Sequence, residues 1–77
     1  MVVSAGQEGL VAMAAAITIV GSALATAWAE KVIGAASVGA IAEKPELFGR
    51  VLTLVVIPET IIIFGLIIGF SLLGLLG

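Results

Sequence analysis

The chain lacks several residue types that carry chemistry in other proteins. It has no cysteine, no histidine and no tyrosine among its 77 residues. Without cysteine there are no disulfides and no thiolate metal sites. Only three residues are basic and the net charge is −2, so nucleic acid is not expected as a partner. No nucleotide-binding or nucleophile motif occurs either, and we therefore expect no catalytic activity and no cofactor.

Charge is scarce throughout. Charged residues make up 10% of the chain, against about a quarter in a soluble domain, and 62% of the chain is hydrophobic. Two long runs, 9–29 and 51–77, contain no charge except Glu59. A spanning helix needs about 20 mostly apolar residues, so two spans fit and three do not. The first eight residues include Glu8 and no lysine or arginine, which argues against a cleaved signal peptide.

The pattern predicts an all-α hairpin of two transmembrane helices that forms one domain over residues 1–77. We expect helix 1 over about 6–42, a loop over about 43–46 and helix 2 over about 46–76. Ser4 and Gln7 have the spacing of a capping box at the start of helix 1. Pro45 disfavours helical geometry at Lys44 and suits the first turn of the next helix.

The basic residues near the turn set the predicted orientation. Lys44 and Arg50 flank the turn, whereas neither end of the chain carries a lysine or arginine. The positive-inside rule therefore places the loop in the cytoplasm and both ends outside.

Small residues in helix 1 predict close packing between copies. Gly21, Ala25 and Ala29 share one face, while Ala23 and Ala27 lie on nearly the opposite face. Two such faces allow a close neighbour on each side. We therefore expect a closed homo-oligomeric ring, with helix 1 inside and the bulkier helix 2 outside.

Glu59 is the main candidate for function. A carboxylate within a spanning helix is costly and usually serves transport or proton relay. It follows Pro58, which has no N–H and leaves the carbonyl of Leu54 without its helical partner. A carbonyl freed in this way, together with the carbonyl of Ile57 and the hydroxyl of Thr60, can complete an ion site beside the carboxylate.

Glu30 is the second candidate. It lies 15 residues before Pro45 and Glu59 lies 14 after it, so a hairpin turning at Pro45 brings both to equal depth. Two carboxylates in one dry site do not both ionise, so we expect Glu30 to keep its proton while Glu59 exchanges a proton or a cation. The alternative for Glu30 is an ion pair with Lys31 of a neighbouring chain. Sodium could bind at Glu59, Glu30 and Thr60.

Three segments resemble the c subunit (the proteolipid, also called K or L) of A-type and V-type rotary ATP synthases. They are the run from Gly34 to Gly49 around the turn, Ile57-Pro58-Glu59-Thr60, and Phe64-Gly65-Leu66. The resemblance implies a rotor-ring protein that couples transmembrane H⁺ or Na⁺ flow to ring rotation, with Glu59 as the ion carrier. It also implies partners: identical subunits, a stator subunit with half-channels, central stalk subunits and membrane lipid. The location implied is the inner (cell) membrane of a bacterium or archaeon.

The resemblance extends to further residues. It implies that the loop residues Glu43, Lys44, Glu46 and Arg50 contact the stalk. Glu30 falls where many members have a glutamine that helps form the ion site. Phe64 stands where sodium-binding members often have a tyrosine. The identity of the coupling ion therefore stays open between H⁺ and Na⁺, with protons favoured.

A different class of function also explains the small residues: an oligomeric pore or structural membrane hairpin of the holin type. It does not explain why Glu30 and Glu59 lie at matching depth beside Pro58.

Overall fold

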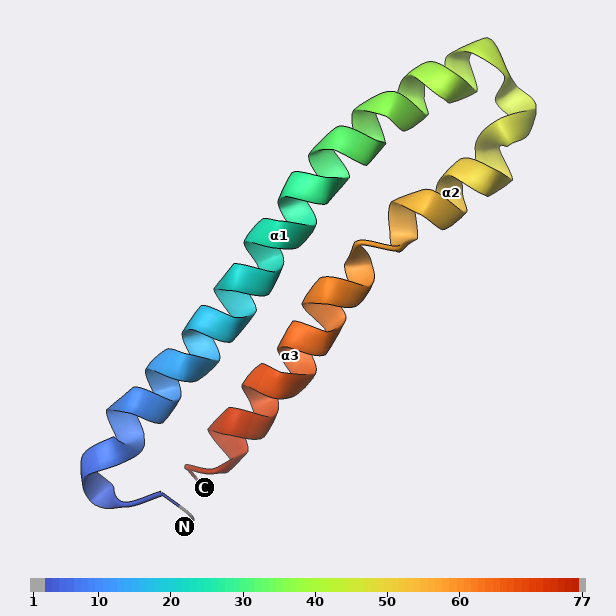
Figure 1. Cartoon of the computed structure of the whole chain (residues 1–77). Coiled ribbons are helices and arrows are strands. Elements are labelled where there is room, and N and C mark those ends of the chain that lie inside the picture. Colours follow the sequence, from blue (N-terminus) through green and yellow to red (C-terminus); the bar gives the residue numbers. More distant parts are fainter. Residues whose placement is uncertain (1–2, 77) are drawn as a thin grey trace.

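The structure, a computed structural model that describes residues 3–76, is a hairpin of two antiparallel helical arms (Figure 1). One arm is α1 (Glu8–Glu43), preceded by a 3₁₀ turn at Ala5–Gln7. The other arm contains a 3₁₀ turn at Pro45–Leu47, then α2 (Phe48–Val56) and α3 (Glu59–Gly74). Both ends of the chain lie at the end opposite the turn (Figure 1). The predicted all-α hairpin is confirmed.

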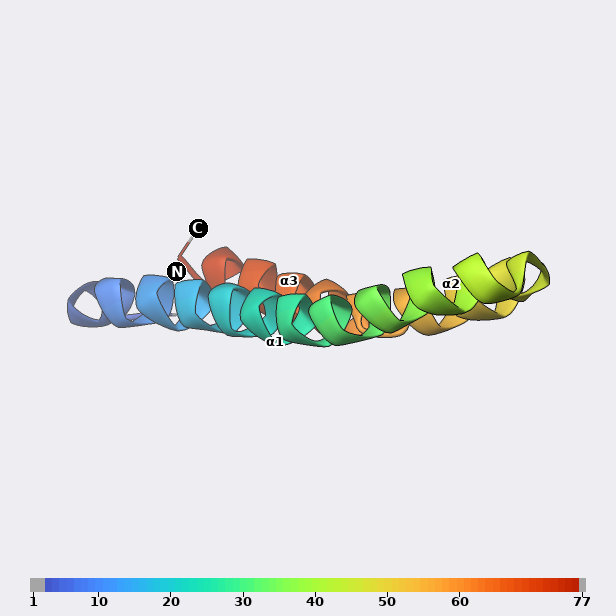
Figure 2. The same cartoon turned by 90° about the horizontal axis from the view of Figure 1, so that it is seen from above.

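Both arms are long and apolar enough to cross a membrane. The two candidate spans are Ala5–Glu43 and Pro45–Gly74, and only 11% and 17% of their most apolar windows are buried within the hairpin. Such low burial is the opposite of what the core helix of a soluble protein shows. The molecule measures 58 × 17 × 9 Å, thin and gently bowed in the view of Figure 2. Since the hydrocarbon core of a bilayer is about 30 Å thick, the hairpin is longer than the core it would cross.

The start of α1 differs from the prediction. Ser4 makes no side-chain capping bond, so the capping box is wrong. The backbone N–H of Gln7 instead donates to the carbonyl of Ser4 at 3.0 Å and closes a 3₁₀ turn, which satisfies the same donor without the side chain.

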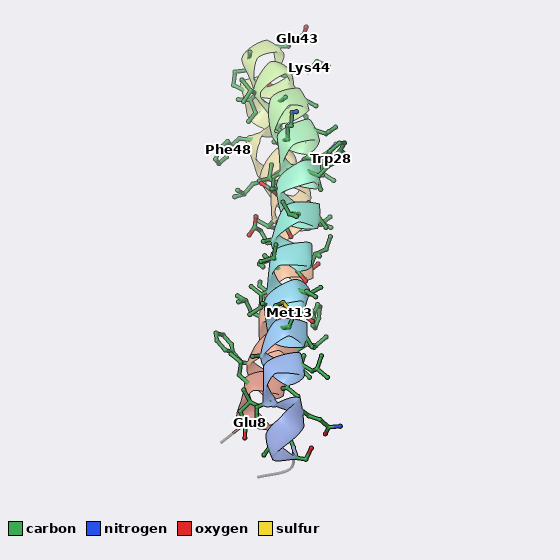
Figure 3. All side chains as sticks on the ribbon, turned by 90° about the vertical axis from the view of Figure 1, so that its left-hand side faces the viewer. Glu8, Met13, Trp28, Glu43, Lys44 and Phe48 are labelled. Carbon is green, nitrogen blue, oxygen red and sulfur yellow. The ribbon has the colours of Figure 1, made fainter. Side chains whose placement is uncertain are left out.

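The turn between the arms is short. Helix α1 ends at Glu43, and only Lys44 separates it from the 3₁₀ turn that Pro45 begins. The backbone N–H of Lys44 donates to the carbonyl of Ala40 at 2.9 Å. Proline fits this place because its missing N–H would be unpaired at the start of a helix in any case. Figure 3 shows Glu43 and Lys44 at this end and Glu8 at the other.

The second arm is not one continuous helix. Helix α2 ends at Val56, Ile57 and Pro58 form a turn, and α3 starts at Glu59. The cause is Pro58, which cannot donate to the carbonyl of Leu54. The amides of Thr60 and Ile61 donate to the carbonyls three residues back, Ile57 and Pro58, both at 3.1 Å. Pro58 therefore divides the helix expected over about 46–76 into α2 and α3.

Small residues hold the arms together. Ala15, Thr26 and Ser37 are the buried residues of α1, and Gly65 and Gly69 those of α3. A Cβ on Gly69 would lie 2.5 Å from Cγ1 of Ile19, and one on Gly65 would overlap the side chain of Ser22. At Gly65 the arms approach so closely that only glycine fits, because Cβ of Ser22 is fixed to its backbone, whereas at Gly69 a larger residue would require the Ile19 side chain to shift.

Candidate ion-carrying site

Glu59 is the first residue of α3, directly after the break. Its side chain is exposed on the hairpin, whereas Pro58 before it is buried against α1. About 22 Å of helix lies between Glu59 and the end of α3 at 1.5 Å per residue. The carboxylate therefore projects from an apolar arm, far from the C-terminal end of α3.

One hydrogen bond fixes the register of the two arms at this level. The hydroxyl of Thr26 in α1 donates to the carbonyl oxygen of Pro58, Oγ1 to O, at 3.1 Å. Thr26 is only 7% exposed, so the bond lies inside the contact between the arms.

This register corrects the equal depth expected for the two acids. Glu59 lies beside the level of Thr26, while Glu30 lies four residues, about 6 Å, nearer the turn. Counting from Pro45 missed this offset, because it assumes the same rise per residue in both arms, whereas the second arm includes a 3₁₀ turn at Pro45–Leu47, which rises about 2.0 Å per residue, and a break at Ile57 and Pro58. Side chains on a helix lean toward its N-terminus, so in antiparallel arms the two carboxyl groups lean toward each other and reduce the offset.

Glu30 and Glu59 face the same flank of the hairpin. Thr26 and Pro58 mark the directions in which the arms face each other. Around the axis of its own helix, Glu59 lies about 100° from the direction of Pro58, because it is one residue further along. Glu30 lies about 40° from the direction of Thr26, because it is four residues further along. Because both helices are right-handed and run in opposite directions, both turns lead to the same side. Among residues 3–76 no hydrogen bond joins the two carboxyl groups.

Glu30 is half-buried, and its Oε1 is buried without a hydrogen-bond partner. An ionised oxygen in such a place would lose its hydration with nothing to replace it, which is costly. A protonated oxygen would instead bring a donor to a region where the carbonyl of Leu54 has lost its helical partner. Leu54 lies one helical turn from Pro58 toward the hairpin turn, and Glu30 lies one helical turn from Thr26 in the same direction. Leu54 and Glu30 are therefore at the same level of the two arms.

Thr60 and Ile57 are joined to each other. The Thr60 hydroxyl donates to the Ile57 carbonyl at 2.8 Å, and the Thr60 amide donates to the same oxygen at 3.1 Å. Both groups thus lie at the break beside Glu59. The hydroxyl uses its proton within its own helix, as threonines in membrane helices often do, and keeps its oxygen lone pairs available.

The residues described contain no group of three or more His, Cys, Asp or Glu that could hold a metal ion. A cation at this break would have to use the two carboxylates together with hydroxyl and carbonyl oxygens. Such oxygen ligands suit hard cations.

Sequence reasoning did not single out Thr26, whose hydroxyl contacts the break. The available signal was its position one helical turn before Glu30, on the face that α1 turns toward the other arm.

The loop residues predicted to contact a stalk lie together at the turn. Glu43, Lys44, Glu46 and Arg50 are all exposed there. Lys31, the alternative partner of Glu30, is exposed on α1.

A family model that describes the C subunit of ATP synthase matches residues 13–72, which is well over half of the chain. No curated protein matches the chain significantly. The matched segment includes both arms, the turn, and the region around Thr26, Glu30 and Glu59. Members of this family are non-catalytic membrane proteins that carry ions as parts of a ring of identical subunits within ATP synthase. The chain belongs to the ATP synthase C-subunit family.

Proposed function

We propose that this protein carries protons on Glu59 in the rotor ring of an A-type or V-type rotary ATP synthase. The observation that supports this most directly is the exposed carboxylate on the flank of the hairpin at the break after Pro58. A charged carboxylate facing lipid is costly, and neutralisation removes most of that cost. Glu59 is loaded from one half-channel of a stator subunit, travels neutral through lipid and is discharged at the other. One charge crossing the membrane supplies about 2.3 kcal/mol per 100 mV, so several ions are needed for each ATP.

The flanks of the hairpin support a ring. Ala27 follows Thr26 by one residue just as Glu59 follows Pro58, so Ala27 shares the flank of Glu59. Gly21 and Ala25 lie toward the opposite flank, and all three small residues are exposed in the single hairpin. When hairpins stand side by side, the small flank of one copy packs closely over Glu59 of the next. In that arrangement α1 forms the inner layer and α3 the outer layer.

Glu30 is the second carboxylate of the same site. It keeps a proton, because its buried Oε1 has no donor in the hairpin. The exchanging ion then resides on Glu59 alone. Sodium is the alternative ion, bound by Glu59, Glu30 and the oxygens of Thr60 and Ile57. Phe64 provides no further hydroxyl.

The loop faces the cytoplasm and contacts the central stalk. Lys44 and Arg50 place positive charge at this end of the hairpin, in agreement with the positive-inside rule. The exposed Glu43, Lys44, Glu46 and Arg50 offer charges of both signs to soluble stalk subunits.

Labelling with dicyclohexylcarbodiimide tests the proposal, because this reagent needs a protonated acid in an apolar setting. In purified rings at mildly acidic pH we expect rapid modification of Glu59, found by mass spectrometry of peptides. The loop acids Glu43 and Glu46 serve as internal controls, and Glu59→Gln removes the modified peptide. Equal labelling of the loop acids would refute the role of Glu59. If added sodium slows the labelling of Glu59 at fixed pH, the coupling ion is sodium and not the proton.

A further inference from the structure

The hydrogen bond from Thr26 to Pro58 differs from every other side-chain hydrogen bond among residues 3–76. The hydroxyls of Thr18, Ser22, Thr53, Thr60 and Ser71 all donate to carbonyls three or four residues back in their own arm. Within residues 3–76, Thr26 alone donates across to the other arm. Among the donors of these side-chain hydrogen bonds, Thr26 is also the one that is buried.

The acceptor is placed where the backbone is least supported. Because Pro58 has no N–H, the regular helical bond from residue 58 to residue 54 is missing, and α2 and α3 are joined by the turn at Ile57 and Pro58. A joint of this kind can rotate α3 relative to α2 more easily than an intact helix can. The Pro58 carbonyl receives the Ile61 amide at 3.1 Å from its own arm, and the Thr26 hydroxyl at 3.1 Å from α1.

The direction of Glu59 depends on the rotation of this joint. With the Pro58 carbonyl held by α1, Pro58 is buried against α1 and the next side chain, Glu59, projects from the flank. A rotation of the first turn of α3 would move Glu59 toward α1 in one sense or toward the outer face in the other. Either movement would take it away from the flank that it shares with Glu30.

We propose that Thr26 is a positioning residue for ion transport: its hydroxyl, bonded to the Pro58 carbonyl, holds the break in the rotation that keeps Glu59 on the flank of the hairpin. This inference rests on the proposed role of Glu59 as ion carrier. Thr26 itself touches no ion. Its effect is on the fraction of time that the carboxylate spends in the position where it is loaded and discharged.

The test compares Thr26→Val with Thr26→Ser in purified rings. Valine has nearly the shape of threonine but no hydroxyl, whereas serine keeps the hydroxyl. A net hydrogen bond of ordinary strength corresponds to roughly a two- to tenfold change in populations. We expect Thr26→Val to change the carbodiimide labelling rate of Glu59 by that factor and to shift the pH of half-maximal labelling. Thr26→Ser should restore both toward the original values.

Thr18→Val is the matched control. Its hydroxyl is on the same helix but donates only to Ala14 of its own turn, at 2.8 Å, so its loss should leave labelling unchanged. Ring mass on native electrophoresis shows whether each variant assembles. If Thr26→Val does not assemble, Thr26→Ala and Thr26→Ser are compared instead, since both fit the space that threonine fills.

The outcomes separate the two proposals. If Glu59 of the unaltered protein is not labelled selectively, the proposed function fails, whatever Thr26 does. If Glu59 is labelled selectively but the rate and pH profile are the same with and without the hydroxyl, the positioning role is wrong. If Thr26→Ser has the same labelling rate and pH profile as the variant without a hydroxyl, the methyl group of Thr26 and not its hydroxyl is responsible. That result would also overturn the positioning role.

Discussion

Replacing Gly65 by alanine should force the two arms of the hairpin apart. A Cβ at this position would overlap both Oγ and Cβ of Ser22. Ser22 cannot turn away freely, because its hydroxyl donates to the Thr18 carbonyl at 2.7 Å and its Cβ is fixed to the backbone. The contact must therefore be relieved by movement of α3 relative to α1.

The size of the effect follows from the overlap with Cβ of Ser22, which is fixed to the backbone of α1. Carbon atoms pack at about 3.5–4.0 Å, so the arms must separate by roughly 1 Å. Overpacking of this kind costs about 1–3 kcal/mol. We place Gly65→Ala in the upper part of this range, because Ser22 has no flexible end to yield. A separation of that size would also lengthen the bond from Thr26 to Pro58, now 3.1 Å.

The assay is thermal unfolding of the purified protein in mild detergent, followed by circular dichroism. Gly49→Ala is the matched control, because a Cβ there meets nothing within 4 Å and Gly49 is exposed in the first turn of α2. That control should be neutral or slightly stabilising, since alanine favours helix over glycine by up to about 1 kcal/mol. A Gly65→Ala protein as stable as Gly49→Ala would refute the close packing of the arms.

Three further outcomes are expected. Glu59→Gln should abolish ion transport by reconstituted enzyme, measured as ATP-driven acidification of vesicles, whereas Glu30→Gln should keep transport and alter its pH range or ion preference; loss of all transport in both variants would contradict the division of roles. Ala25→Leu should split or resize the ring, because close backbone approach needs small residues, and an unchanged ring mass on native electrophoresis would count against α1 as the packed layer. Lys44→Gln combined with Arg50→Gln should weaken binding of the ring to stalk subunits without changing carbodiimide labelling of Glu59, and unchanged co-purification of the stalk would remove these residues from the contact.

The sequence predicts where the second arm is interrupted but not which groups form hydrogen bonds there. Pro58 in an apolar run predicts a kink, since a missing N–H is a property of one residue. Which side chain of the first arm reaches the carbonyls of the break is decided by how the two arms pack. The predicted ligands Thr60 and Ile57 are bonded to each other, and the hydroxyl that reaches Pro58 comes from Thr26, 32 residues away. No local pattern marks that pairing.

The sequence by itself determined the class of the protein. Two long apolar runs, a turn with Pro45, and a single carboxylate within the second run suffice for a membrane hairpin with Glu59 as its candidate ion carrier, because hydropathy and helix length are additive properties of the chain. Only the tertiary structure decided how the arms are aligned. The offset of Glu30 from Glu59 depends on which residues of α1 meet Gly65 and Gly69, and on the bond that seats Pro58 against α1. Close packing of that kind depends on atoms from both arms at once, and a count of residues from the turn does not contain it.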